Sequence, residues 1–233
     1  MLENNFFLPD EFSLVNEEFY ARGVSPAQTD ELLAGAWRHF GARFFRYNLG
    51  FYNEEIRRVL PLRIRLSDFT NSKSQRRIFR KNRDLQTIVR PIGITTEKEN
   101  LFERHKQRFA HGVPGSIYDF LDSDAADTPC EALEVCVYDD KKLLAASFFD
   151  VGETSVSGVY AVFEPTETAR SLGIFTMLLE IDFALKSGKD FYYSGYAYAG
   201  NSFYDYKKRF SGLETYDWNE GIWKDFSERA ISR

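Results

Sequence analysis

The 233 residues carry a formal net charge of −5, and 43% of them are hydrophobic, which is ordinary for a globular protein and excludes wholesale disorder. Two cysteines are too few for a disulfide framework or a four-cysteine zinc site, and the three histidines show no metal-binding spacing. The stretch MLENNFFLPDEF is acidic where a secretory signal would be basic, and no apolar run is long enough to span a bilayer. These features predict a cytoplasmic protein without a bound metal or other cofactor.

In chain order, the first predicted elements are a helix and two strands. The segment SPAQTDELLAGAWRHFG predicts a helix from about Pro26 to Arg38, with Gly41 near its end. The segments ARFFRYNLGFY and VLPLRIRLSDF are typical of strands, because the second alternates apolar and polar residues from Leu62 to Ser67.

The next predicted helix concentrates positive charge. The stretch SKSQRRIFRKNRDL holds six Lys or Arg in fourteen residues, and residues 57–90 carry a net +9, which leaves −14 for the rest of the chain. Its start at Ser72 matches the S-x-x-Q capping box. Arg76, Arg80 and Arg83 share one face of this helix, where like charges repel weakly. Two interpretations are open, a solvated basic face or a surface that binds a polyanion.

The remaining segments predict a strand, two helices, a β-meander, a long helix and a further strand. DLQTIVRPIG is typical of a strand, KENLFERHKQRFAHG and SIYDFLDSD of helices, and DSDAADTPC of a polar loop. Hairpin signals at 139–140 and 152–153 separate three alternating runs. ARSLGIFTMLLEIDFALKSGK predicts a long helix that ends near Gly188, and DFYYSGYA predicts a strand after it.

This order resembles an α+β acyltransferase domain of the N-acetyltransferase (GNAT) type. That fold places an acyl donor at the N-terminus of the central helix, where free N–H groups meet phosphate. The usual loop there reads Q/R-x-x-G-x-G/A, and this chain offers Arg170, Gly173 and Phe175 at its key positions. Phe175 would crowd a pyrophosphate, which argues against coenzyme A as the donor.

Three segments together resemble the aminoacyl-tRNA–protein transferases of the N-end rule: PLRIRLSDFTNSKSQRRIFRKNRDL, RSLGIFTMLLEIDFALKSG and FYYSGYAYAGNSFYDYKKRF. AWRHFGARFFRY is also similar to the W-R-R-S-G-x-x-x-Y-R segment of that family, so the match runs in blocks from about Leu32 to Phe210. The resemblance implies a GNAT-like domain over 71–233, preceded by a small α/β lobe over 1–70. It also implies transfer of Arg or Leu from tRNA to the N-terminal Asp or Glu of a protein or peptide.

The resemblance implies roles for individual residues. Conversion of an ester to an amide needs alignment of amine and carbonyl, a neutral amine and stabilisation of the oxyanion, but no covalent nucleophile. The implied catalytic residues are Glu180, Tyr193, Tyr206 and Lys207. The residues implied to bind substrate are Gln75, Arg76, Arg77, Gly195 and Tyr196. Those implied to contact the tRNA backbone are Arg80, Lys81 and Arg83. We expect the arginine-rich helix and the tyrosine-bearing strand to converge on one cleft.

One departure from the family concerns its N-terminal cysteines. The segments Phe6–Pro9 and Asn53–Leu60 stand where those cysteines would be, and neither contains one. A haem, iron–sulfur or other metal role tied to them is therefore not expected. Other interpretations stay open: a transferase acting on a small peptide or metabolite in biosynthesis, or a non-catalytic RNA- or protein-binding relative. Tyrosines of the last strand can equally serve in packing, and Glu180 can lie on a solvated helix face.

Overall fold

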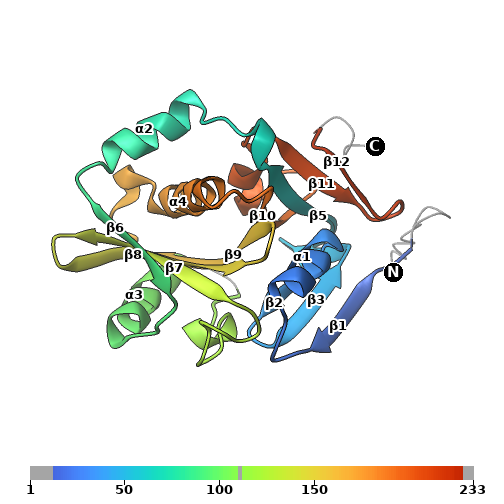
Figure 1. Cartoon of the computed structure of the whole chain (residues 1–233), viewed down its shortest axis with the longest axis horizontal. Helices are drawn as coiled ribbons and strands as arrows, with labels where there is room; N and C mark the ends of the chain where they lie inside the picture. The colour runs from blue at the N-terminus through green and yellow to red at the C-terminus, as the bar shows by residue number, and fades with distance from the viewer. Residues whose placement is uncertain (1–12, 110–111, 228–233) are drawn as a thin grey trace, which may run out of the picture.

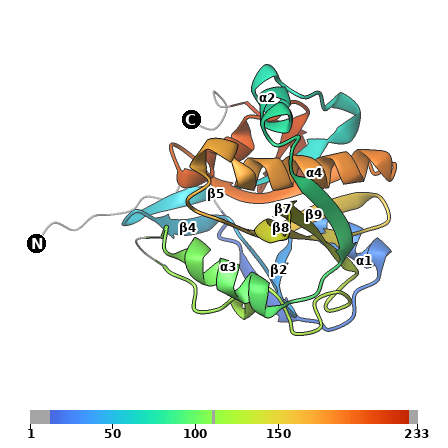
Figure 2. The same ribbon diagram turned by 90° about the vertical axis from the view of Figure 1, so that its left-hand side faces the viewer.

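The computed structural model describes residues 13–109 and 112–227, so the segment Phe6–Pro9 lies outside the described residues. A large mixed sheet forms the centre of the molecule (Figure 1). Two helices, α2 (Lys73–Lys81) and α4 (Leu172–Lys186), cover one face, and α3 (Thr96–Lys106) covers the other (Figure 2). A small three-stranded sheet with helix α1 (Pro26–Ala34) lies beside α3 on that second face.

The larger sheet has the spatial order β12-β11-β5-β10-β9-β8-β7-β6, with β4 paired to β5. Its strands in chain order are β4 (Leu49–Tyr52), β5 (Glu55–Arg65), β6 (Gln86–Pro91), β7 (Ala132–Asp139), β8 (Lys142–Val151), β9 (Ser155–Phe163), β10 (Phe191–Tyr198), β11 (Leu213–Asp217) and β12 (Ile222–Asp225). The predicted meander β7-β8-β9, the long helix and the following strand are all present. The α+β, GNAT-like order predicted from the sequence is therefore confirmed.

The small sheet has the order β1-β3-β2, with β1 (Asn16–Tyr20), β2 (Arg38–Phe40) and β3 (Arg43–Tyr47). The helix predicted to reach Arg38 ends four residues earlier, because Gly35 caps it and Ala36 adopts a φ of 63° that turns the chain. Arg38 therefore begins a strand. The lobe boundary at residue 70 stays a prediction; β5, which precedes it, pairs with β10 and β11 in the larger sheet.

The strands β9 and β10 diverge in the middle of the sheet. They pair in parallel only from Phe191 to Tyr193, opposite Ser155 to Ser157. A register shift follows between Tyr193 and Gly195, after which β10 pairs with β5 alone. Gly195 has a φ of 87°, which an L side chain rarely adopts. The result is an opening between the far halves of β9 and β10.

Helix α4 lies between the sheet and α2 and is buried on two sides. Its residues Leu172, Phe175, Leu178 and Ile181 belong to the main core, and Phe79 of α2 packs edge-on against Phe175 with 5.9 Å between ring centroids. The capping box predicted at the start of α2 is present, with the Ser72 backbone and side chain paired to Gln75. This packing explains why α4 carries buried residues around most of its circumference.

Some elements differ from the sequence-based predictions. The segment SIYDFLDSD forms a single 3-10 turn, η2 (Ile117–Asp119), rather than a helix. The strands β1, β11 and β12 were not predicted. Within the described residues, no helix has both the length and the apolarity to cross a membrane.

Helix α3 is fixed to the sheet by a buried ion pair. Lys98 is 1% exposed, and its Nζ lies 2.5 and 2.6 Å from the two carboxylate oxygens of Glu134, which is fully buried on β7. Arg90 also donates to Glu134 at 2.8 Å. Removal of Lys98 leaves the buried Glu134 carboxylate with only the half-exposed Arg90 as a cationic partner among the described residues, so its charge is poorly compensated.

We therefore expect Lys98→Met to lower the free energy of unfolding by about 3–5 kcal/mol in urea denaturation. The matched control is Lys186→Met, which removes an exposed pair with Asp182 on α4 and should cost less than about 1 kcal/mol. Equal losses in the two variants would contradict a special role for the buried pair.

Candidate active site

The opening between β9 and β10 is occupied by a guanidinium from the small sheet. Arg38 of β2 donates to Ser157 Oγ at 3.0 Å and to the Gly158 carbonyl oxygen at 2.7 Å, both on β9. A Cβ on Gly195 of β10 would lie only 3.1 Å from Cζ of Arg38. Arg38 thus bridges the two diverging strands, and Gly195 is the residue that leaves room for it.

A buried carboxyl approaches the same place from α4. Glu180 is 3% exposed, and the Tyr192 hydroxyl donates to its Oε2 at 2.5 Å. A Cβ on Gly158 would lie 2.9 Å from that oxygen, so Gly158 admits the carboxyl to the opening. Burial raises the pKa of Glu180 to about 7, although the hydrogen bond from Tyr192 opposes the shift.

The third group comes from the turn η4 (Phe203–Lys208). Lys207 donates to the Tyr196 carbonyl oxygen at 3.2 Å, and its Nζ lies 5.3 Å from the Tyr204 ring centroid. Removal from water and, to a smaller extent, the charge of nearby Arg38 lower the pKa of Lys207 to about 7, although Glu180 opposes the shift. Lys207 is half-buried and is therefore more accessible than Glu180. Two groups with pKa values moved toward neutrality in one place mark a candidate site for proton transfer.

Tyr206 lies next to this group. Burial raises the pKa of its hydroxyl to about 12, and Glu180 and Arg108 both act on it electrostatically. Arg108 lies over the rings of Phe163 and Phe203, at 4.6 and 5.0 Å from their centroids. The opening therefore has an aromatic rim that carries a further cation.

A small apolar hollow lies beside the opening, on the face of the sheet that carries α1. Tyr193 faces this hollow, and its hydroxyl accepts from Arg63 at 3.2 Å. Tyr196 also lines it, and the Tyr196 hydroxyl donates to the Ala36 carbonyl oxygen at 2.6 Å. Burial raises the pKa of both tyrosines. The full lining is Leu33, Ala36, Trp37, Arg38, Pro61, Leu62, Tyr193, Gly195, Tyr196 and Trp223.

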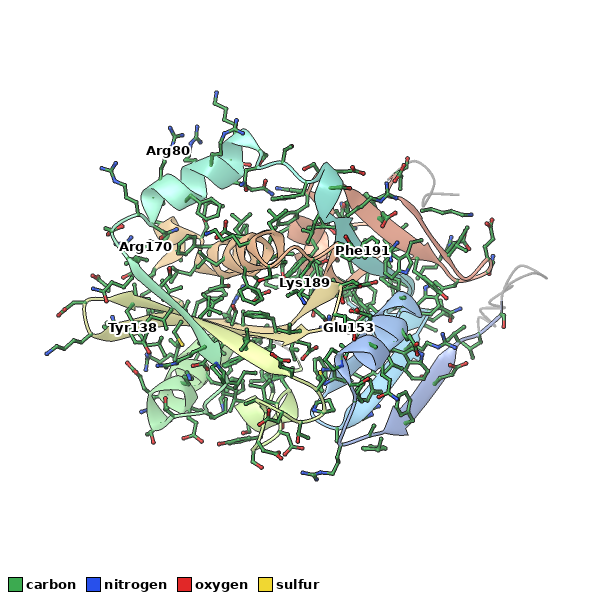
Figure 3. The ribbon with its side chains drawn as sticks, in the orientation of Figure 1. Arg80, Tyr138, Glu153, Arg170, Lys189 and Phe191 are labelled. Atoms are coloured by element: carbon green, nitrogen blue, oxygen red, sulfur yellow. The ribbon has the colours of Figure 1, made fainter. Side chains whose placement is uncertain are left out.

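The arginine-rich helix forms a separate surface. The side chains that we call the α2 basic surface are all exposed: Arg76, Arg77, Arg80, Lys81 and Arg83. None forms an ion pair with a described residue; Arg76 and Lys81 instead donate to the backbone carbonyls of Asn71 and Ala169. Figure 3 shows Arg80 pointing away from the body of the molecule. Gln75 is buried in the capping box, so its side chain is already engaged.

The predicted convergence of this helix with the tyrosines of β10 is wrong. The α2 basic surface lies on the outer side of α4. Tyr193 and Tyr196 lie on the opposite face of the larger sheet, next to α1 and the small sheet. The reason is the position of α4, which separates α2 from the sheet. The structure does bring Glu180, Lys207, Tyr206 and Gly195 together.

Sequence reasoning misses Arg38 and Tyr192. The pattern of the segment SPAQTDELLAGAWRHFG places Arg38 at the end of the predicted helix. The signal that could have indicated Arg38 is its position in AWRHFG, which is similar to a segment of the transferase family. Tyr192 directly precedes the predicted Tyr193, and strand alternation turns it toward α4. Phe175 does not face a phosphate site, because it is 3% exposed and belongs to the core. Instead, Asn82 and Lys81 bind the carbonyls just before α4.

Known proteins match this chain over most of its length. The model of the family described as "Arginine-tRNA-protein transferase, C terminus" matches residues 97–217. The chain belongs to the arginine-tRNA-protein transferase family. It is 32% identical over 185 residues to the aspartate/glutamate leucyltransferase of Stenotrophomonas maltophilia, covering 75% of this chain and 72% of that one. It is 27% identical over 195 residues to the protein of the same name from Campylobacter jejuni, with 82% and 80% covered.

Solved structures resemble this member of the family more distantly. FemX aligns over 82% of this chain and 68% of its own, with 12% identity and a TM-score of 0.48. L-PGS from Bacillus licheniformis aligns over 66% and 58%, with 14% identity and a TM-score of 0.44. Likenesses at this level do not bear on substrate or mechanism.

The raised pKa of Glu180 predicts how stability depends on pH. The folded state holds a proton on this carboxyl that the unfolded state releases above the ordinary glutamate pKa of 4.5. The stabilisation is therefore complete below about pH 4.5 and is lost as the pH rises to about 7. Glu180→Gln should remove this decline, worth at most about 3 kcal/mol, in urea denaturation between pH 5 and 8.

The control for this measurement is Asp182→Asn, two residues away on α4, whose carboxyl is paired with Lys186 near solvent. It should retain the pH dependence of the wild type. A Glu180→Gln profile that parallels the wild type would show that folding does not raise the pKa of Glu180.

Proposed function

We propose that this protein transfers leucine from aminoacyl-tRNA to the N-terminal Asp or Glu of a protein or peptide. Membership of the arginine-tRNA-protein transferase family supports a tRNA-dependent transfer, and the names of its relatives support leucine and an acidic acceptor. The observation that carries the proposal is the joint placement of Glu180, Lys207 and Arg38 at the opening between β9 and β10. Because charged tRNA is cytoplasmic, we place the protein in the cytoplasm.

The reaction exchanges one bond for another. The acceptor amine forms a C–N bond with the carbonyl carbon of the aminoacyl ester, the ester C–O bond breaks, and the ribose oxygen leaves with a proton. An α-ammonium must lose a proton before it attacks. Lys207 is partly buried and has a pKa of about 7, so at neutral pH a large fraction of it is neutral and can accept that proton. This scheme needs no covalent nucleophile.

Glu180 serves a different role in this scheme. Gly158 and Tyr192 enclose its carboxyl, so it acts on the site through its charge and not by direct contact with the substrate. Ionisation of Glu180 raises the pKa of Lys207, whereas Arg38 lowers it. Glu180 and Arg38 together therefore set the proton affinity of the Lys207 amine.

The names of the relatives, and not the shape of the site, support leucine over arginine as the transferred residue. The hollow beside Tyr193 has a mostly apolar and aromatic lining, including Leu33, Pro61 and Leu62. Its volume of about 10 Å³ holds no more than a water molecule, so it does not select the transferred side chain.

A transfer assay tests the proposal directly. With labelled Leu-tRNA, the protein should modify peptides that begin with Asp or Glu and leave a matched Ala peptide unmodified. Replacement of Leu-tRNA by Arg-tRNA should lower the rate at least about tenfold. Lys207→Met should retain tRNA binding but lose at least about 100-fold in transfer. Binding of tRNA without transfer by the wild type would instead identify a non-catalytic relative, and transfer to the Ala peptide alone would exclude an acidic acceptor.

The α2 basic surface is expected to contact the tRNA backbone. Arg76→Ala combined with Arg77→Ala should abolish transfer at physiological salt, because it removes two guanidinium groups that have no acidic partner within the described residues. Since both side chains are exposed, the melting temperature should be nearly unchanged.

A control for charge alone is Lys141→Ala combined with Lys142→Ala, at the exposed turn between β7 and β8. This variant should transfer leucine like the wild type. If the arginine double variant unfolds, the two arginines are structural; if both double variants lose activity equally, the effect is one of net charge and not of the α2 basic surface.

A further inference from the structure

Three buried side chains from distant parts of the sequence meet between the small sheet and the larger one. His39 comes from β2, Cys130 from the segment before β7, and Asp150 from the end of β8. They are 7%, 2% and 2% exposed. One ligand atom of each lies within 4.8 Å of the other two. Their separation in the sequence explains why no metal-binding spacing is visible there.

The hydrogen bonding of His39 is unusual for a neutral imidazole. Its Nδ1 lies 2.9 Å from the Gly41 carbonyl oxygen, and its Nε2 lies 2.9 Å from Oδ2 of Asp150. A carbonyl and a carboxylate can only accept, whereas a neutral imidazole donates from one nitrogen only. Either a second proton or a cation must therefore lie between Nε2 and the carboxylate.

The geometry favours a cation that all three groups share. Zinc bound tetrahedrally to N, O and S ligands places them about 3.3 to 3.6 Å apart. Here the Nε2–Oδ2 distance is 2.9 Å, the Nε2–Sγ distance is 4.0 Å and the three ligand atoms lie within 4.8 Å of one another, so shifts of about 1 Å bring them to such a site. Nδ1 is already held by a carbonyl, which is the arrangement that fixes the tautomer of a metal-bound histidine.

A hollow reaches this cluster and leaves space for a fourth ligand. His39 and Asp150 line it, together with Gly41, Thr128 and other residues that precede β7. Catalytic and many mixed-ligand zinc sites keep one position for water. A thiolate, an imidazole and a carboxylate form a donor set that suits zinc better than magnesium or calcium, which prefer oxygen alone.

We propose that His39, Cys130 and Asp150 form a binding site for a zinc ion that joins β2 to β8. The inference is independent of the proposed transferase function. Binding releases the thiol proton, and also the second imidazole proton if one is present, so affinity falls on acidification. Because Arg38 precedes His39, an ion here also fixes the strand that presents Arg38 to the opening between β9 and β10.

Cobalt substitution tests this site in the full-length protein without a histidine tag. After treatment with a chelator, titration with Co²⁺ should give one equivalent of tetrahedral visible bands and a near-ultraviolet thiolate-to-cobalt charge-transfer band. Zn²⁺ should abolish both. Cys130→Ser should lose the charge-transfer band and bind Zn²⁺ at least about tenfold more weakly in competition with a chromophoric chelator.

Cys136→Ser is the matched control, because the chain has only two cysteines and Cys136 lies buried beside Glu134, away from this cluster. It should keep the band, and since Cys130 is then its sole thiol, the band must come from Cys130 even if Cys130→Ser fails to fold. A wild-type titration without the charge-transfer band overturns the proposal and identifies the cluster as a buried imidazolium–aspartate pair. Loss of the band in Cys136→Ser overturns it as well.

Discussion

The site depends on one constraint: β9 and β10 pair for three residues and then separate, and Arg38 occupies the gap. A guanidinium removed from water must find acceptors, and Ser157 and the Gly158 carbonyl supply them on the β9 side. On the β10 side, Gly195 leaves the space. The two strands cannot close without removing Arg38, so the small sheet determines the shape of the opening.

Arg38 also influences the two titratable groups beside it, Glu180 and Lys207. Glu180 and Lys207 lie near Arg38, and desolvation moves the pKa of each toward neutrality from opposite sides. A lysine in water would stay protonated and could not accept a proton from an ammonium group. Burial next to Arg38 lowers the pKa of Lys207 so that it can accept a proton, whereas Glu180 limits the fall in this pKa. The proton affinity of the site is therefore a property of all three groups and not of Lys207 alone.

The elements that have local signals were predictable from sequence. The capping box set the start of α2, and the alternating runs with their turns indicated the meander, because both signals depend on neighbouring residues. The end of α1 was not predicted in the same way, since the helix ends at Ala34 with Gly35 as its cap, and the positive φ of Ala36, which alanine rarely adopts, then turns the chain. The convergence of Glu180, Lys207 and Arg38 brings Arg38 to two residues that lie more than a hundred positions later in the chain. The resemblance named the first two residues, but only the fold brings Arg38 to them.

The charged groups to which the proposed function gives roles lie in two different environments, the exposed surface of α2 and the partly buried opening between β9 and β10. The side chains of the α2 basic surface are exposed to water, where a polyanion could contact several of them at once. The groups at the opening are partly or fully removed from water, where charge is costly and proton affinity can be adjusted. Helix α4 connects the two: Phe175 packs against α2 at one end, and Glu180 reaches the opening about one and a half turns later. On the proposed function, a tRNA bound to the α2 basic surface would be positioned relative to Glu180 by α4, so the two surfaces need not meet in one cleft.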